Sequence, residues 1–292
     1  MSRSLLVRHR QQGIALALVV WFIAGMSLLV AGIVSQARVD TKLAQLHVSR
    51  AKAAASGDGA ITMLLADHYL NPAEIVGDAG ASQRRYRLGD TSVLVSLQPA
   101  AGLINLDLAP PEQLLALFVS VGGLNEQDAR QLADNMVQWR AGATPTGRGA
   151  TGNRFHAVED LLQIEGMNRS LFDILRDYVV AGTAARSGMD WSVAPAALLP
   201  VLELSDPQQL TSIERRRQRM ANENALGPPT AADGGSSRGL SGAYRADAWV
   251  TYGNSTWLRR RWVSMGADPN SALPWRTERT EAPRVVRAAG AL

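Results

Sequence analysis

The sequence contains no cysteine. This absence excludes disulfides, thiol nucleophiles and zinc sites built on cysteine. It does not place the chain in the cytosol, because exported proteins can fold without disulfides.

Histidines are also scarce. The four are His9, His47, His68 and His156, and none has the spacing of a paired metal ligand. No nucleotide-binding or serine-hydrolase motif lies in a suitable strand-turn-helix context. We therefore expect a protein that is not an enzyme.

Charge does little to narrow the function. The chain carries 30 basic and 26 acidic residues, a net charge of +4 and a pI near 9.8. Mild basicity suits nucleic acid, an anionic membrane surface or simple solubility. The 292 residues suffice for one large domain or two moderate ones.

The longest apolar segment lies near the N-terminus. Residues 14–34 form a 21-residue run without a charge, about the length that crosses the hydrocarbon core of a bilayer. Arg3, Arg8 and Arg10 precede it, which predicts a cytoplasmic N-terminus and a bulk outside the cytoplasm. The alternative is an ordinary secretory signal cleaved near Ala37.

Helical spacing of apolar residues continues beyond this run. It persists to about Leu70, where Asn71 and Pro72 predict a stop. One helix over 14–70 is therefore expected to begin in the membrane and end in a soluble domain.

Alternating residues indicate strands on both sides of a central segment. Residues 85–98 form a predicted hairpin around Gly89 and Asp90, and 244–252 with 257–265 form a second. These strands predict a small antiparallel sheet packed on the long helix. Because 105–222 has mainly helical patterns, the predicted fold class is α+β with a large inserted helical domain.

The insert contains a repeat and two predicted helical hairpins. Residues 103–117 and 189–202 both place an Ala-Pro pair before leucines, so each proline is expected in the first turn of a helix. The hairpins span 114–139, turning at Gly122 and Gly123, and 158–179, turning at Gly166.

These hairpins resemble helix-hairpin-helix elements, which in other families hold DNA phosphates through backbone amides. Here Glu126 and Asp128 lie in the first turn and Glu165 in the second. Acidic groups at that point oppose phosphate binding, so we expect architectural hairpins and no nucleic-acid partner.

Other charged residues fit caps and solvated surfaces. Calcium takes oxygen ligands, so the carboxylates of the insert are candidate ligands, but they lack the spacing of a calcium-binding loop. These carboxylates are Asp107, Glu112, Glu159, Asp160 and Glu165. Calcium is kept as a candidate with no ligands assigned. The arginines at 215–219 lie on a predicted helix and are expected on its solvated face. The arginines at 259–261 lie on a predicted strand and are expected at a charged sheet edge.

The N-terminus resembles a prepilin signal. A short basic leader ends at Gly13 and is followed by Ile14 and the apolar helix. The resemblance implies cleavage between Gly13 and Ile14 by a prepilin peptidase and N-methylation of Ile14. The family usually has glutamate at the fifth mature position, where this chain has Leu18.

Later segments strengthen a narrower resemblance, to the minor pseudopilin K family of type II secretion systems. They are Ile104 to Pro110, the helix end at Trp139 and Arg140, the segment from Val158 to Leu162 and the second Ala-Pro pair, in family order. A missing glutamate also marks that family. The resemblance covers the chain from Arg10 to about Arg276.

The resemblance implies a subunit that initiates and caps the periplasmic pseudopilus and supports export of folded proteins. Its implied partners are the minor pseudopilins of I, J and H type, the major pseudopilin, the prepilin peptidase and the bacterial inner membrane, crossed once. Two alternatives stay open: a minor pilin of a type IV pilus, and a membrane-tethered DNA-binding protein of a competence-like system.

Together these patterns predict the following division: a leader at 1–13, the long helix at 14–70, a pilin-like sheet at 71–104 plus 243–268, an inserted helical domain at 105–222, a flexible loop at 223–242 and a loosely ordered tail at 269–292.

Overall fold

A computed structural model describes residues 12–70, 81–142, 153–182, 188–225, 242–253, 255–266 and 272–286. The chain divides into two units, Met1–Lys52 and Ala53–Leu292. The first helix, α1 (Gln12–Leu70), contributes to both. Most of the predicted leader at 1–13 and most of the predicted loop at 223–242 lie outside the described residues.

The part of α1 in the first unit is exposed along nearly its whole length. Large apolar side chains such as Trp21, Phe22 and Leu28 are more than half exposed. By length and composition, this helix can cross a membrane.

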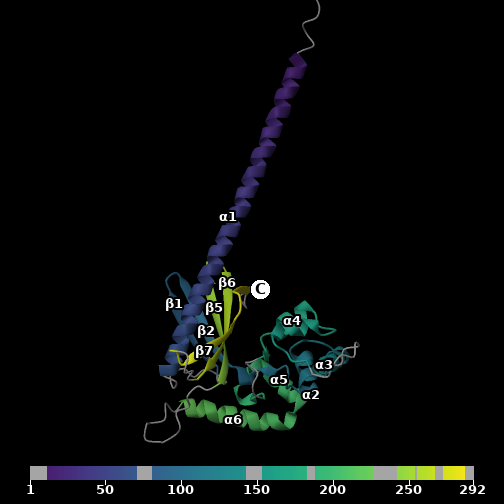
Figure 1. Cartoon of the computed structure of the whole chain (residues 1–292), viewed down its shortest axis with the longest axis vertical. Coiled ribbons are helices and arrows are strands. Elements are labelled where there is room, and N and C mark those ends of the chain that lie inside the picture. The colour runs from purple at the N-terminus through teal and green to yellow at the C-terminus, as the bar shows by residue number, and fades with distance from the viewer. Residues whose placement is uncertain are drawn as a thin grey trace, which may run out of the picture. The chain divides into compact units, whose positions relative to one another are not determined.

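The second unit contains a six-stranded antiparallel sheet (Figure 1). Its main path runs β1-β2-β5-β6-β7, and β8 also pairs with β6. The strands are β1 (Ser82–Leu88), β2 (Thr91–Pro99), β5 (Gly242–Tyr252), β6 (Ser255–Met265), β7 (Trp275–Thr280) and β8 (Arg284–Val286). Both predicted hairpins are present, and they pair through β2 and β5.

The C-terminal segment differs from the prediction. Residues 269–292 were expected to be loosely ordered, yet β7 and β8 both pair with β6, at 261–265 and 256–258 respectively. These strands are short and mostly polar, so their sequence has little strand signal. Pairing with a distant strand gives them their structure.

One face of the sheet packs on the C-terminal part of α1. The apolar core here joins the helix to β2, β5, β6 and β7, and includes Ile61, Leu64, Val95, Val250 and Trp275. Gly57 permits the close approach: a Cβ there would lie 2.7 Å from Cβ of Arg259 on β6. The predicted packing of the long helix on an antiparallel sheet is confirmed.

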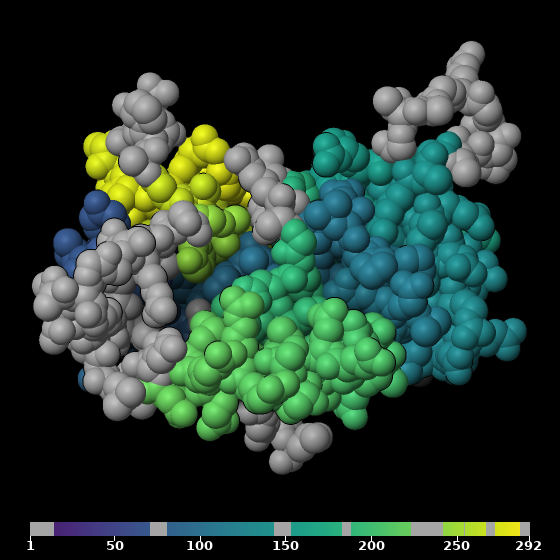
Figure 2. Space-filling view, turned by 90° about the horizontal axis from the view of Figure 1, so that it is seen from below, coloured from purple at the N-terminus to yellow at the C-terminus, as the bar shows by residue number. Residues whose placement is uncertain are grey.

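The insert leaves the sheet after β2 and returns at β5. Its helices are α2 (Pro111–Ser120), α3 (Glu126–Arg140), α4 (Arg169–Leu175), α5 (Leu199–Ser205) and α6 (Pro207–Ala225). The short 3₁₀ helices are η2 (Ala100–Gly102), η3 (Val158–Gln163), η5 (Trp191–Val193) and η6 (Ala196–Leu198). A two-stranded parallel sheet pairs β3 (Ile104–Asn105) with β4 (Val179–Val180). Figure 2 shows α6 lying across one face of the insert. The predicted α+β class with additional helices is therefore confirmed.

Of the two predicted helical hairpins, the first is confirmed and the second is wrong in part. α2 and α3 form the first, with Gly123 at φ +70° in its turn. The expected helix pair at 158–179 is wrong in part: its first half is η3, and its end is strand β4. Val158 and Leu161 are buried at three-residue spacing, which suits a 3₁₀ turn, and Val179 pairs with Ile104.

The prolines of the Ala-Pro repeat lie one residue earlier, relative to the helices, than predicted. Pro110 and Pro195 are extended N-cap residues, one position before the first helical turn. Pro111 takes the first position of α2 and biases Pro110 toward an extended conformation. The second copy begins as separate 3₁₀ turns instead of a strand.

Candidate functional site

The predicted processing site lies at the start of α1. Gly13 and Ile14 belong to the helix, and only their backbone is described. Leu18 is 62% exposed. A hollow along this helix from Phe22 to Lys42 is lined by α1 alone, so it is the groove between side-chain rows of one helix and encloses no ligand.

The glycine amides of the first hairpin turn are already hydrogen-bonded, so they are not available to a phosphate. The N–H groups of Gly122, Gly123 and Leu124 donate to carbonyl oxygens of α2, over 3.0 to 3.2 Å. The side chain of Asn125 accepts from the N–H of Asp128 and caps α3. This geometry supports the architectural interpretation of the hairpin.

The motif from Ile104 to Pro110 is held by a side-chain turn. The Asn105 side chain accepts from the N–H groups of Asp107 and Leu108, at 2.8 and 3.2 Å. Asp107 in turn accepts from the N–H of Phe155 at 2.8 Å. The structure thus assigns these polar residues to the framework that starts α2.

Trp139 and Arg140 tie the end of α3 to this same framework. Arg140 donates to the carbonyl of Ala109 at 2.6 Å, and the Trp139 ring packs 4.3 Å from that of Phe155. Burial lowers the pKa of Arg140, an effect that Asp107 opposes. These sequence motifs therefore converge in space.

The remaining candidate calcium ligands do not gather. Asp160 accepts from the N–H groups of His156 and Ala157, and Glu159 binds Arg279. Glu112 is exposed in the first turn of α2, and the Glu165 carbonyl binds Asn135. Among the residues that the structure describes, no three His, Asp or Glu side chains could jointly hold a metal ion. Calcium binding stays a prediction.

The arginine cluster at 259–261 is paired and lies on an interior strand. Arg259 and Arg261 reach Asp58 of α1, each at 2.8 Å, while Arg260 points to the opposite face. The expected charged sheet edge is therefore wrong, because β7 and β8 cover β6 on that side. The alternation that argued against a continuous cationic stripe is confirmed.

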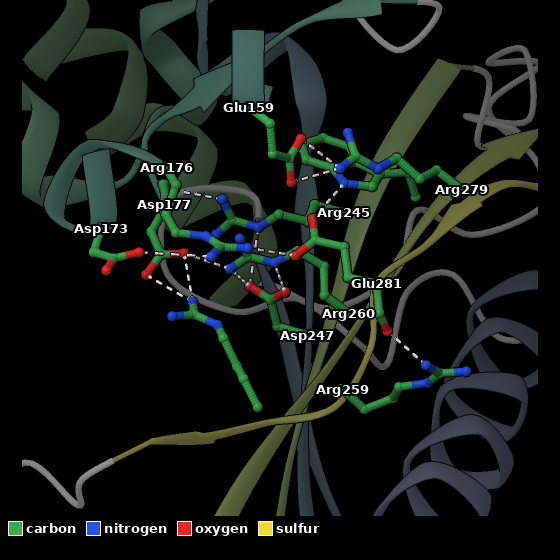
Figure 3. A network of polar contacts seen from close by, with 12 residues as sticks. Glu159, Asp173, Arg176, Asp177, Arg245, Asp247, Arg259, Arg260, Arg279 and Glu281 are labelled. Carbon is green, nitrogen blue, oxygen red and sulfur yellow. Dashed lines mark hydrogen bonds and ion pairs between the residues drawn. The ribbon is translucent and has the colours of Figure 1, made fainter. Parts of the chain in front are cut away.

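The opposite face of the sheet carries a buried charged cluster (Figure 3). Asp247 and Arg260 are directly opposed on β5 and β6, and each is 3% exposed. Arg260 binds Asp247 through two hydrogen bonds of 2.6 and 3.1 Å, and Arg245 lies 2.9 Å from the same carboxylate. We call Arg245, Asp247 and Arg260 the sheet triad.

Opposing effects set the protonation of the triad. Burial by itself raises the pKa of Asp247, but Arg245 and Arg260 outweigh it and hold that pKa below its usual value. Burial lowers the pKa of Arg245. For Arg260 burial acts in the same direction, but Asp247 outweighs it and raises the pKa. The triad is therefore charged at neutral pH.

Three residues of the insert, Glu159, Arg176 and Asp177, make further contacts at this cluster. Asp177, just after α4, lies 2.8 Å from Arg260 and 3.0 Å from Arg284 of β8. Arg176 binds Glu281 at 2.9 Å, and Glu159 binds Arg279 of β7 at 2.8 and 2.7 Å. Sequence reasoning missed Asp58, Asp177 and Asp247. The available signal for Asp247 was its position two residues after Arg245, which places two opposite charges on the same face of a predicted strand.

Comparisons with known proteins complete the description. No family model and no curated protein matches the sequence. Among solved structures, one chain of the GspK-GspI-GspJ complex from the type 2 secretion system of enterotoxigenic Escherichia coli is similar, with 13% identity and a TM-score of 0.48. The match covers 85% of this chain and 99% of that chain. A likeness at this level carries no argument about function.

Proposed function

We propose that this chain is a minor pseudopilin that initiates and caps the periplasmic pseudopilus of a type II protein secretion system. In this role it is anchored in the bacterial inner membrane by α1, with its N-terminus cytoplasmic and its bulk periplasmic. Its partners are the I and J types of minor pseudopilin, then the H type and the major pseudopilin. The prepilin peptidase acts on it before assembly.

Leu18 is the observation that carries the proposal. It lies at the fifth position after the Gly13–Ile14 junction, within an uncharged apolar run. In pilin-like filaments a glutamate there is thought to neutralise the N-terminal amine of the preceding subunit. A first subunit has no predecessor, and a carboxylate buried without a partner would cost several kcal/mol. Leucine suits that environment.

The position of the insert supports a tip role. It covers the sheet face opposite the one that packs on α1, through the contacts of Asp177 and its neighbours. Subunits of this width would collide if they repeated along a thin shaft, whereas a single copy at the end has room.

Intact-mass analysis of the membrane-extracted protein tests the class. In cells with the prepilin peptidase, we expect a chain that begins at methylated Ile14, and in cells without it an unprocessed chain. Gly13→Leu should block cleavage. Gly25→Leu is the matched control, because Gly25 has no other residue close to the added Cβ.

Two outcomes would contradict the proposal: the same unprocessed N-terminus in both strains, or cleavage near Ala37. If processing occurs as expected, co-purification with I-type and J-type pseudopilins tests the tip role. Binding to type IV pilus subunits instead would favour the pilus alternative. A DNA titration with a steep salt dependence would favour the DNA-binding alternative.

A further inference from the structure

The insert and the sheet have separate hydrophobic cores. The core of the insert is built from residues between Ile104 and Val201, and the core of the sheet from residues of α1 and the strands. None of the residues that the structure describes belongs to both cores. A small cluster bridges them: Ala100, Leu103, Val180 and Trp262. Four side chains provide little apolar area to fix the position of a domain of this size.

Charged contacts add to this joint, and Asp177 is their centre (Figure 3). Its carboxylate contacts Arg260 and Arg284, and its carbonyl accepts from Arg245. Arg176 to Glu281 and Glu159 to Arg279 lie beside it. These three insert residues fall within 159–177, so the charged contacts come from one short part of the insert.

A different part of the insert contacts the chain near η2, where the chain passes from the sheet into the insert. The N–H of Asp190 donates to the carbonyl of Ala101 at 2.7 Å, and the Gln98 side chain donates to the carbonyl of Val193 at 2.9 Å. A Cβ on Gly102 would lie 2.4 Å from that carbonyl, so the backbones touch here. The chain itself runs from β2 into the insert here, whereas the Asp177 contacts are ion pairs and a hydrogen bond between residues far apart in the sequence.

The charged contacts differ among themselves in solvent access. The side chain of Asp177 is 39% exposed and that of Arg284 is 31% exposed. Salt and competing charged groups therefore reach this pair, although they do not reach Asp247 and Arg260.

We propose that the Asp177 contacts form a releasable electrostatic lock, and that releasing it lets the insert rotate about η2 as a rigid body with both cores intact. Without the Asp177 carboxylate, Arg284 loses its ion-pair partner at 3.0 Å, and Arg260 keeps Asp247. The ion pairs that then remain across the joint are Arg176 with Glu281 and Glu159 with Arg279, and the carboxylate contacts at its centre are gone. This inference does not depend on the role in secretion.

Distance measurement between spin labels tests the lock in the full chain in detergent. Because the chain has no cysteine, two introduced cysteines are labelled uniquely. Gln138 on α3 and Thr251 on β5 are exposed and report on the joint. Gln138 and Gln218 on α6 report on the insert itself.

In the parent protein we expect a narrow distance distribution for both pairs. Asp177→Ala should broaden or shift the Gln138–Thr251 distribution and leave the Gln138–Gln218 distribution unchanged. Asp173→Ala is the matched control: the partners of Asp173, Arg169 and Arg176, both belong to the insert. It should leave both distributions narrow.

An unchanged Gln138–Thr251 distribution in Asp177→Ala would overturn the proposal. Broadening of both pairs would also overturn it, because that result indicates an unfolded insert. If Asp177→Ala does not fold, Arg284→Gln and a salt titration of the parent protein from about 0.05 to 1 M replace it, with the same expected outcomes.

Discussion

The two faces of the sheet are buried by different chemistry. The face toward α1 is covered mainly by aliphatic contacts, such as Ile61 and Leu64 against Val95 and Val250. The face toward the insert carries the sheet triad and meets Asp177. Apolar burial is non-directional and scales with area, whereas ion pairs depend on exact placement. The first face therefore supplies most of the stability, and the second sets where the insert sits.

The largest effect should come from the sheet triad. Asp247→Ala leaves two guanidinium groups buried without their carboxylate, and we expect it to lower the free energy of unfolding by about 3–5 kcal/mol. Tryptophan fluorescence during denaturant unfolding measures this loss, because β6 carries the buried residues Trp257 and Trp262 on either side of Arg260 in the sequence. Asp173→Ala should cost less than about 0.5 kcal/mol. Equal losses of unfolding free energy in the two variants would contradict the greater importance of the buried sheet triad over the exposed Asp173 pairs.

The α1 face can be disturbed through its glycines. Gly57→Ala places a Cβ 2.7 Å from Cβ of Arg259, so we expect a loss of about 1–3 kcal/mol despite better helix propensity. Gly59→Ala meets only Leu88 at 3.6 Å and should add about 0.5–1 kcal/mol. Opposite signs in denaturant unfolding would verify the close helix-sheet contact. Stabilisation by both variants would contradict it.

Acid should weaken the insert face. Burial would raise the pKa of Asp247, but its arginines hold the pKa below that of the unfolded chain. Its contribution is therefore fully present above about pH 4 and is lost as the pH falls through the lower, folded-state pKa. Unfolding measured between about pH 5 and pH 2 should show this decline, and it should be shallower in Asp247→Ala. Identical slopes would exclude Asp247 as the cause.

A smaller pH effect is expected on the α1 face. His68 is 8% exposed near Tyr244, and burial lowers its pKa. The unfolded chain then binds the proton more readily, so stability is full above about pH 6.5 and declines as the pH falls below it. His68→Gln should flatten this slope in thermal unfolding, while His47→Gln, at an exposed position, should retain it. A slope that survives His68→Gln would contradict the assignment.

Much of the α1 face was predictable because its signals are local. The helical spacing up to Leu70 and the alternation in 85–98 and 244–265 predicted the helix and four strands. β7 and β8 were missed, since their sequences are short and polar and they form by pairing with β6. Similarly, Val179 was placed in a helix because its partner Ile104 is distant in the sequence.

The insert face was not predictable for a different reason. Arg245 and Asp247 alternate with Ala246 and Ala248, the pattern of a strand with one solvated face. The insert covers that face, so the polar residues are buried instead. The arginines at 259–261 were noticed, but their acidic partners lie in α1, in β5 and after α4.

The sequence by itself determined the apolar N-terminal helix, the first helical hairpin and the α+β class, and it predicts a processing junction between Gly13 and Ile14. These depend on composition and on spacing within a few turns or strands. Only the tertiary structure decided that both faces of the sheet are covered, that Asp58, Asp177 and Asp247 neutralise the β6 arginines, and that the C-terminal segment joins the sheet. Each of these arises from contacts between residues far apart in the chain, and periodicity in a single sequence carries no information about such pairs.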